Sequence, residues 1–227
     1  MQPNSAVNLK QAMEEKKIIL ANLAGLGKDS QGTVGSLILS LLQVETLERS
    51  RQSRELRKPF HIHIDEAYLF QTDALDNILM QCRKYGVSVS LCHQYLRQYR
   101  PAQVDALASV GSTIIFNIDT SDAQKLCNSL QEKVTFNDIV AMKPYEAIAR
   151  IDTEIVHIKT RQVPPPTHPS GRQRIIDSSH SRYYRTADEV LREINRPNRR
   201  GDQPFTPLVS PAVEGQAAAI GFVYDEF

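Results

Sequence analysis

The stretch that decides the fold is Phe60-His-Ile-His-Ile-Asp-Glu-Ala67, in which an apolar-rich run ends on two adjacent carboxylates. Its first six residues, Phe60 to Asp65, have the composition of a buried strand. A helix over 74–84 and a second strand over 87–92 follow it. Because a strand, a helix and a strand in succession form a βαβ unit, this stretch predicts a parallel sheet with its functional groups at the carboxyl ends of the strands.

The same alternation of helices and strands extends in both directions along the chain. On the amino-terminal side we expect a helix over 7–16, a strand over 18–23 and a long helix from Thr33 to about Arg54, with Leu37, Leu41, Val44 and Leu47 at helical spacing. On the carboxyl-terminal side we expect a helix over 101–110, a strand over 112–117, helices over 120–130 and 135–142, and a hairpin of 145–151 with 154–159. The pattern predicts an α/β fold with a mostly parallel sheet flanked by helices.

Composition limits the class of protein. The 227 residues are 41% hydrophobic and 23% charged, which is typical of a globular domain with extensions. No apolar run approaches the roughly 20 residues of a membrane span, and the N-terminus lacks the apolar centre of a signal peptide. The three cysteines are odd in number and show no CxxC spacing, so we expect a reducing, cytoplasmic setting.

A proline-rich stretch over 162–171 divides the chain. We expect residues 1–161 to form the globular domain, and residues 162–227 to form a linker, one short helix at about 186–195 and a largely disordered tail rich in proline and arginine. Thr186 and Glu189 have the spacing of a capping box at the start of that helix. Residues 161–200 hold nine arginines against four acidic residues, which is typical of an interaction segment.

Two carboxylates at a strand end suit nucleotide hydrolysis. One can hold Mg²⁺ through its water shell, and the other can polarise the attacking water. Asp65 fits the first role and Glu66 the second. A strand that simply runs into an acidic turn is the alternative interpretation of these two residues.

Gln94 and Arg83 support the catalytic interpretation. Gln94 follows the second strand, where its carboxamide could sense a γ-phosphate or the attacking water. Arg83 lies 17 residues after Glu66, near a helix end and a glycine, and could reach a neighbouring subunit's nucleotide as an arginine finger. The alternative is that Arg83 and Lys84 only favour the carboxyl end of a helix.

The segments HIDEAYLF and CRKYGVSVSLCHQY resemble the HerA/FtsK superfamily of P-loop ATPases, and within it the TraD/TraG-type coupling ATPases of conjugation and type IV secretion. The resemblance covers roughly residues 8–195. It implies a RecA-like domain with ATP and Mg²⁺ as cofactors, Asp65 as the Walker B magnesium residue, Glu66 as catalytic base, Gln94 as sensor, and Arg83 acting in trans within a hexamer.

One segment departs from that family's chemistry. Residues 25–30, Gly-Leu-Gly-Lys-Asp-Ser, resemble a phosphate loop, but Asn22 stands at the first glycine and Asp29 replaces the magnesium-binding hydroxyl. We interpret 25–30 as a turn after a strand. Without a Walker A loop we expect the chain alone to be inactive, with its other half upstream or on a partner chain; a membrane anchor would also belong to such a missing N-terminal region.

Arginines in two places are candidates for DNA contacts. Arg97 and Arg100 follow the sensor strand, in a loop that could face a central pore, and Arg182 and Arg185 lie in the basic tail. Ordinary solvated polar segments are the alternative in both places.

Three functions remain open at this stage. The first is the C-terminal part of a hexameric, ATP-driven DNA translocase of a mobile element, acting with relaxosome or secretion-channel proteins. The second is a non-catalytic remnant that binds DNA or a complete ATPase. The third is a different parallel-sheet enzyme in which the Asp65–Glu66 pair does other work.

Overall fold

The computed structural model describes residues 7–130, 133–165 and 171–194, and the chain divides into two compact units. Unit 1 combines residues 1–31 with residues 168–227, and unit 2 comprises residues 32–167. In its described part, unit 1 contains the helices α1 (Leu9–Glu14), α7 (Arg172–Tyr183) and α8 (Ala187–Ile194). Helix α2 (Lys28–Glu48) begins at the boundary between the units and lies mostly in unit 2.

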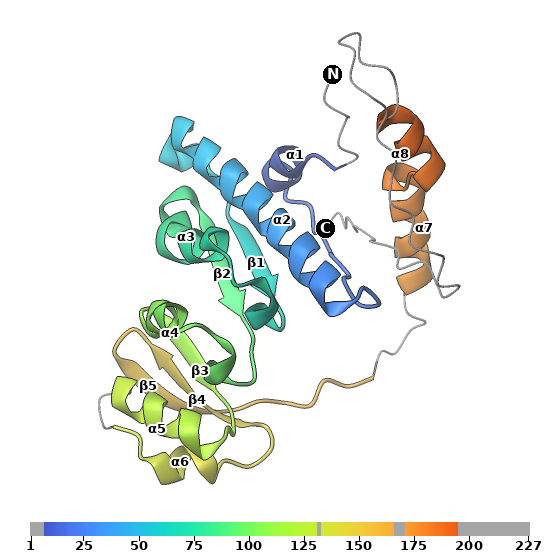
Figure 1. Ribbon diagram of the computed structural model, residues 1–227. Coiled ribbons are helices and arrows are strands. Elements are labelled where there is room, and N and C mark those ends of the chain that lie inside the picture. The colour runs from blue at the N-terminus through green and yellow to red at the C-terminus, as the bar shows by residue number, and fades with distance from the viewer. Residues whose placement is uncertain (1–6, 131–132, 166–170, 195–227) are drawn as a thin grey trace. The chain divides into compact units, whose positions relative to one another are not determined.

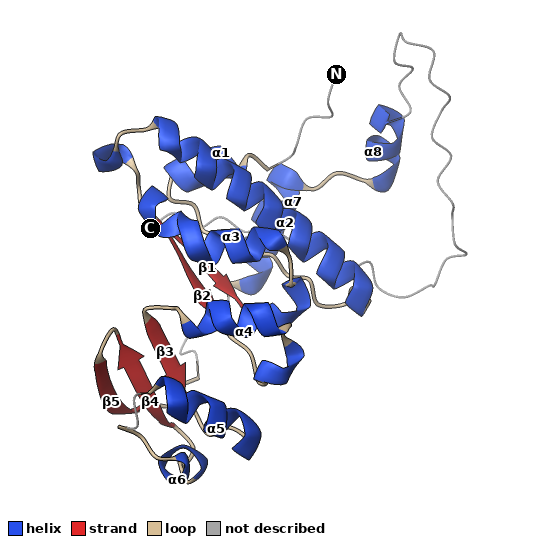
Figure 2. Cartoon of the chain, turned by 60° about the vertical axis from the view of Figure 1, so that its left-hand side comes forward, coloured by secondary structure: helices blue, strands red, loops and turns tan. Residues whose placement is uncertain are grey.

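Unit 2 contains all of the described strands, and its elements follow one another as Figures 1 and 2 show. After α2 come the 3₁₀ turns η1 (Arg49–Arg51) and η2 (Arg54–Leu56), strand β1 (Phe60–Ile64), η3 (Ala67–Phe70), α3 (Asp73–Gln81), η4 (Cys82–Tyr85), β2 (Val87–Leu91), η5 (Leu96–Gln98) and α4 (Pro101–Ala108). The unit continues with β3 (Ser112–Ile115), α5 (Thr120–Ser129), α6 (Phe136–Val140), β4 (Glu146–Ile151) and β5 (Glu154–Lys159).

Strands β1 and β2 form a parallel pair, in register from Phe60 opposite Val87 to Ile64 opposite Leu91. The chain returns from one strand to the next through α3, which follows the N-cap Thr72, and then through η4, which ends at Gly86. Gly86 has a φ of 75°, a left-handed conformation that glycine adopts without steric cost. The βαβ unit and the parallel pairing expected from the sequence are therefore confirmed.

Strand β3 pairs with the hairpin instead of extending the parallel pair. It runs antiparallel to β4, and β4 runs antiparallel to β5, with a turn at Asp152 whose φ is 52°. The Arg150 guanidinium supports this pairing, since it donates to Val110 O (2.8 Å) and to Thr113 Oγ1 (3.1 Å). The α/β class is confirmed, whereas three of the five described strands belong to an antiparallel sheet.

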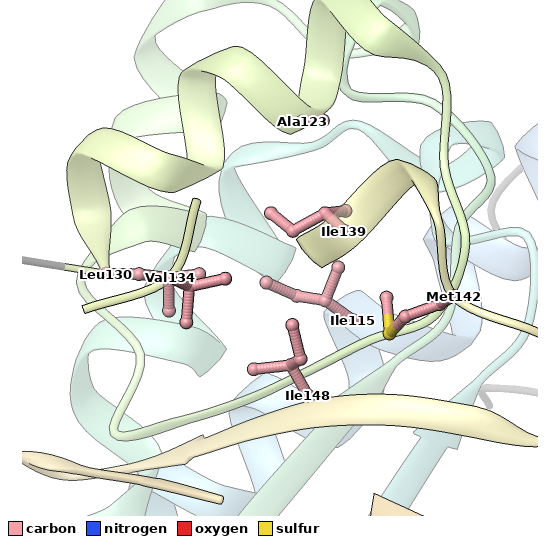
Figure 3. Packing of buried hydrophobic residues seen from close by; sticks show 7 residues of the cluster. All are labelled: Ile115, Ala123, Leu130, Val134, Ile139, Met142 and Ile148. Carbon is pink, nitrogen blue, oxygen red and sulfur yellow. The ribbon is translucent and has the colours of Figure 1, made fainter. Parts of the chain in front are cut away.

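Helices α5 and α6 cover one face of this antiparallel sheet. The core between them contains buried aliphatic side chains from both layers, which Figure 3 shows converging: Ile115, Ala123, Leu130, Val134, Ile139, Met142 and Ile148. Ile139 and Ile148 are fully buried. Full burial of an aliphatic side chain of this size contributes about 1.5–3 kcal/mol, so this core holds α5 and α6 on the strands.

Helix α2 is apolar on two faces. It buries the positions Gly35, Leu39, Leu42 and Thr46, whereas the stripe singled out from the sequence, Leu37, Leu41, Val44 and Leu47, is 38–59% exposed. The periodicity correctly predicts a helix but does not decide which of two apolar faces packs inward. The helix also begins at Lys28, earlier than the expected Thr33.

Two sequence expectations outside unit 2 are wrong. Residues 18–23 form no strand, and Ile18 and Leu20 are 38% and 54% exposed; a strand exists only where its backbone pairs with a neighbour, and no described strand pairs with this segment. Helix α7 was not expected, because it is polar on almost every face and therefore lacks an apolar period. Helix α8 does begin with the expected capping box, in which Thr186 N donates to Glu189 Oε2 (2.8 Å) and Glu189 N donates to Thr186 Oγ1 (3.2 Å).

Candidate functional site

Asp65 and Glu66 lie directly after β1, at the carboxyl end of the parallel pair. Two hydrogen bonds continue the pairing past the strands and hold this edge together: Cys92 N donates to Ile64 O (2.9 Å), and Ala67 N donates to Cys92 O (3.0 Å). Asp65 is exposed, and its Oδ1 accepts a hydrogen bond from the backbone N of Glu66 (3.0 Å). The acidic pair is therefore positioned by the backbone of both strands.

Glu66 adopts a left-handed backbone conformation, with φ 47° and ψ 46°. This conformation costs a non-glycine residue roughly 1–2 kcal/mol, so surrounding structure has to hold it. Ala67, which follows, is completely buried and opens the 3₁₀ turn η3. The strained residue thus turns the chain sharply out of the strand direction at the position expected to carry the catalytic carboxylate.

Gln94 meets Glu66 across the end of the two strands. Its Nε2 donates a hydrogen bond of 3.0 Å to Glu66 Oε1, although the two residues are 28 positions apart in the chain. Glu66 Oε2 and Gln94 Oε1 make no hydrogen bond within the described residues. The pair therefore presents one carboxylate oxygen and one amide oxygen that remain available to a water molecule or a phosphate.

A second glutamine, Gln71, joins η3 to the loop that follows Gln94. Its Nε2 donates to Tyr68 O (2.9 Å) and to Gln98 O (2.7 Å), and its Oε1 accepts from Arg100 N (3.1 Å). The Arg100 side chain also donates to the backbone O of Gln71 (3.3 Å). Movement of the loop around Arg100 would consequently act on the turn that starts at Glu66.

The same loop is fixed at its centre by a buried carboxylate. Asp122 is 3% exposed, and its Oδ2 accepts from Leu96 N at 2.8 Å. Arg97 lies over the Tyr95 ring, 4.4 Å from its centroid, and 3.8 Å from Asp119. Arg97 and Arg100 are both exposed, so the structure places the two expected DNA-contacting arginines on one ordered loop beside the acidic edge.

The rings of His93 and Tyr99 pack against each other beside this edge. Their rings meet edge to face with centroids 5.0 Å apart, and His93 Nδ1 and Tyr99 Oη are buried without a hydrogen-bond partner among the described residues. Burial lowers the pKa of His93, against the opposing effect of Asp122 and Glu66. Burial raises the pKa of Tyr99 far above its usual range, and the charges of Glu66 and Cys92 add to the shift. Burial therefore favours the neutral form of the His93 imidazole.

Arg83 lies at the other end of the parallel pair. It belongs to η4, which precedes β2, whereas Glu66 and Gln94 follow β1 and β2. Five strand residues at about 3.3 Å each separate the two ends, so Arg83 does not reach the acidic pair of its own chain. Its side chain is exposed, and the guanidinium has no partner among the described residues. This placement leaves only an intermolecular role for Arg83 at such a site.

The two arginines of the tail lie in unit 1. Arg182 is an exposed residue in the last turn of α7, and Arg185 follows that helix. Arg185 is already engaged, since it forms an ion pair with Glu193 of α8. The structure therefore does not bring these arginines together with Arg97 and Arg100 in one unit.

The segment over 25–30 is a turn followed by a helix. Asn22 Oδ1 accepts from Ala24 N (3.0 Å), Gly25 has a φ of 90°, and α2 begins at Lys28. Asp29 lies in the first turn of α2, where a carboxylate stabilises the helix dipole and disfavours a phosphate. The turn expected over 25–30 is found over residues 25–27, whereas residues 28–30 belong to α2.

The residues around Asp65 fit a magnesium ion held through water. In the part of the chain that the structure describes, no three His, Cys, Asp or Glu side chains lie close enough together to form a complete metal site. Mg²⁺ usually keeps several waters and uses one or two carboxylates together with substrate phosphates. Asp65, exposed and with one carboxylate oxygen unbonded, meets that requirement.

The importance of three residues in this region could not be predicted from the sequence. Gln71 and Asp122 act through backbone groups 27 and 26 positions away. Gly35 is required because a Cβ atom there would collide with the ring of Phe70 at the end of η3. A conserved pattern in related sequences is the kind of signal that identifies such positions.

A comparison with solved structures finds several matches. VirB4 of Thermoanaerobacter pseudethanolicus matches with a TM-score of 0.50 and 18% identity, over 63% of this chain and 40% of VirB4. The bacterial conjugative coupling protein TrwBdeltaN70 matches with a TM-score of 0.49 and 16% identity, over 59% of this chain and 38% of that protein. The genome-packaging NTPase B204 of Sulfolobus turreted icosahedral virus 2, in complex with ATP-gammaS, matches with a TM-score of 0.46 and 15% identity, over 70% of this chain and 74% of B204.

The similarity to VirB4 is one of fold, and it agrees with the RecA-like α/β fold that the resemblance in the sequence implies. The chain spans about two fifths of the length of VirB4 and TrwBdeltaN70. No protein-family model matches the sequence, and no curated protein matches it. Among the described residues, no helix is long and apolar enough to cross a membrane.

Proposed function

We propose that this chain supplies the Walker B half of the ATP-hydrolysing site of a DNA-translocating ATPase of the conjugation and type IV secretion type. The observation that carries the proposal is the hydrogen bond between Gln94 and Glu66 at the carboxyl edge of the parallel β1–β2 pair. In this contact Glu66 is the general base, and Gln94 is the side chain that can bind the attacking water or the γ-phosphate.

Each residue at the edge has a distinct role in this proposal. Asp65 holds the water shell of Mg²⁺, which supplies charge neutralisation to the ATP phosphates. The unbonded oxygen of Glu66 accepts a hydrogen bond from the attacking water and orients it. Gln94 fixes the rotamer of Glu66 through its amide N–H, and its oxygen atom stays available to the water or the γ-phosphate.

Arg83 completes the site from a second copy. Its position at the opposite end of β2 suits a ring in which the amino-terminal edge of one subunit faces the carboxyl-terminal edge of the next. In a hexamer of this kind, the phosphate-binding loop comes from an upstream region or a partner chain. The ring acts on DNA in the cytoplasm, together with relaxosome or secretion-channel proteins.

The test is ATP turnover by this chain assembled with the polypeptide that is encoded immediately upstream of it, with and without DNA. We expect Glu66→Gln to lower kcat by at least about 100-fold while ATP still binds, because only the base is removed. Glu154→Gln, an exposed carboxylate on β5, serves as the matched control. Equal turnover by Glu66→Gln and the control would overturn the catalytic assignment.

The intermolecular role of Arg83 has its own experiment. Arg83→Ala and Glu66→Gln should each be inactive alone, whereas a mixture should regain activity, because about a quarter of the interfaces formed at random carry both intact residues. If the mixture stays inactive, Arg83 does not act in trans.

The second candidate is a non-catalytic subunit that binds DNA or a complete ATPase. The observation that favours it is Asp29 at the position of a magnesium-binding hydroxyl, within the first turn of α2. It gains support if no polypeptide with a phosphate loop is encoded upstream or co-purifies with the chain, and if no ATP turnover is found.

A further inference from the structure

The loop between β2 and α4 is attached in two places to the turn that begins at Glu66. At the start of the loop, Gln94 Nε2 donates to Glu66 Oε1 (3.0 Å). At its end, the Gln71 side chain binds the backbone of Gln98 (2.7 Å) and of Arg100 (3.1 Å). The loop and the turn therefore form one connected structure around the proposed general base.

Tyr99 links the two attachments to each other. It lies between the two residues that Gln71 binds, and it is only 7% exposed. Its ring meets the ring of His93 edge to face, with centroids 5.0 Å apart, and His93 directly precedes Gln94. A displacement of Gln94 therefore acts on Tyr99 through the contact of the two rings.

The hydroxyl of Tyr99 is a buried donor. Its Oη has no hydrogen-bond partner among the described residues. Burial raises the pKa of Tyr99 far above its usual range, and the charges of Glu66 and Cys92 add to the shift, so the hydroxyl keeps its proton. An unpaired buried hydroxyl is destabilising, and such groups are rare enough in native proteins to indicate a catalytic role or a bound water.

Glu66 is the acceptor that suits this donor. Its charge acts on both Tyr99 and His93, so the carboxylate lies within electrostatic range of the two rings. A phosphate accepts hydrogen bonds, so Gln94 can bind a γ-phosphate only through the amide nitrogen that donates to Glu66 in the structure. When Gln94 turns to the phosphate, a second donor is needed to keep the carboxylate oriented.

We propose that Tyr99 is a positioning residue for Glu66: when ATP is bound, its hydroxyl donates a hydrogen bond to the Glu66 carboxylate and keeps it oriented toward the attacking water. The inference rests on the proposed function for the role of Glu66 as general base. Tyr99 acts through that carboxylate and takes no part in the proton transfer itself.

The experiment measures ATP turnover by the assembly with the upstream polypeptide. Tyr99→Phe keeps the ring and removes only the hydroxyl, and Tyr145→Phe makes the same change at a side chain that is 48% exposed. We expect Tyr99→Phe to lower kcat about tenfold and to leave KM for ATP within about twofold, because the lost hydrogen bond orients the base and does not bind ATP. The control should match the unmodified assembly.

Two further measurements separate a positioning role from a structural one. In urea unfolding of the chain without nucleotide, Tyr99→Phe should have a midpoint equal to or above that of the unmodified chain, because the hydroxyl is unpaired in that state. The double variant Glu66→Gln/Tyr99→Phe should turn over ATP as slowly as Glu66→Gln and no slower, because Tyr99 acts only through Glu66.

Any of three results would overturn the inference. A lower urea midpoint for Tyr99→Phe would mean that the hydroxyl already has a structural partner, and this result needs no ATP hydrolysis. The other two are a kcat of Tyr99→Phe equal to that of the control, and losses that multiply in the double variant. If Glu66→Gln is slow while Tyr99→Phe equals the control, only this inference fails. If Glu66→Gln also equals the control, the proposed function fails with it.

Discussion

The left-handed backbone of Glu66 should affect the stability of the fold independently of the carboxylate. Glu66→Gly and Glu66→Ala both remove the carboxylate and its hydrogen bond to Gln94, but only glycine adopts φ 47° without a steric cost. We expect the free energy of unfolding of Glu66→Gly to exceed that of Glu66→Ala by about 1 kcal/mol, measured by urea denaturation. An alanine variant of equal or greater stability would show that residue 66 is not left-handed in solution.

Sequence reasoning at the residue scale works where a side chain follows a recognisable strand. Asp65, Glu66 and Gln94 were identified in this way, and the structure brings the last two into contact. Gln71 could not be found, because a glutamine whose partners are backbone groups of distant residues leaves no local pattern. Its three side-chain hydrogen bonds depend entirely on the tertiary fold.

At the scale of elements, Gln71 should hold η3 against the loop that carries Arg97 and Arg100. We expect Gln71→Ala to lower the free energy of unfolding by about 2 kcal/mol and to speed amide hydrogen exchange at Arg100, while exchange in β1 stays slow. Gln71→Glu keeps the acceptor for Arg100 N but loses both donated hydrogen bonds. Its amide exchange rate at Arg100 should therefore lie between those of the unmodified chain and of Gln71→Ala. Unchanged exchange at Arg100 in the alanine variant would contradict the coupling.

The start of α6 makes a prediction about pH. Hydrogen bonds from the Thr135 hydroxyl and backbone N to Asp138 Oδ2 lower the pKa of that carboxyl, and His157 adds a smaller effect. Thr135→Ala should therefore raise the pKa of Asp138 in an NMR titration. In the unmodified chain the pKa of Asp138 is lower in the folded state than in the unfolded state. The ionised carboxylate therefore contributes its full stabilisation above the ordinary pKa of aspartate, near 4, and Thr135→Ala loses this contribution.

The sign of this dependence gives a second measurement. As pH falls through the lowered pKa of Asp138, the carboxylate is protonated and its contribution disappears, so the unfolding curves of the variant and the unmodified chain should converge in acid. If the two proteins still differ in stability below that pKa, the difference comes from the hydrogen bond of the Thr135 hydroxyl at the start of the helix and not from the charge of Asp138.

Elements with local signals were predicted well, and elements defined by a distant partner were not. The strands β1 and β2, the β4–β5 hairpin and the capping box of α8 were expected at their observed places. By contrast, the strand expected over 18–23 fails and β3 pairs antiparallel with β4, because backbone pairing is decided by residues far away in the chain. The tail over 195–227 lies outside the described residues.

At the scale of the whole molecule, charged and apolar side chains are gathered in particular places, which the composition of the chain does not show. The near-neutral chain gathers seven cations at one end of β1 and β2 and its acidic pair at the other. Periodicity could not show this, because residues 48–58 and 82–86 are distant in the chain and are joined by hydrogen bonds of Arg49 and Arg57 that depend on the fold. Opposite charge at opposite ends of the same strands suits the head-to-tail contact of the proposed ring.

The exposed face of α2 leads to a prediction for the isolated chain. Leu37, Leu41, Val44 and Leu47 recur every three or four residues, and each is at least 38% exposed, so they form an apolar stripe along one side of the helix. Contiguous apolar patches on a protein surface usually mark an interaction site or cause association in water. We expect the chain to self-associate with rising concentration in sedimentation velocity and to bind the dye ANS.

Leu37→Lys/Val44→Glu should abolish both effects, because it places opposite charges on the stripe without changing its net charge. The buried positions Leu39 and Leu42 are untouched, so the melting temperature should stay within a few degrees of the unmodified value. Leu39→Ala is the contrasting variant: it should lower the free energy of unfolding by about 2–4 kcal/mol and leave ANS binding to the native chain unchanged. A monomeric unmodified chain, or a double variant that unfolds, would mean that this face of α2 is packed in solution.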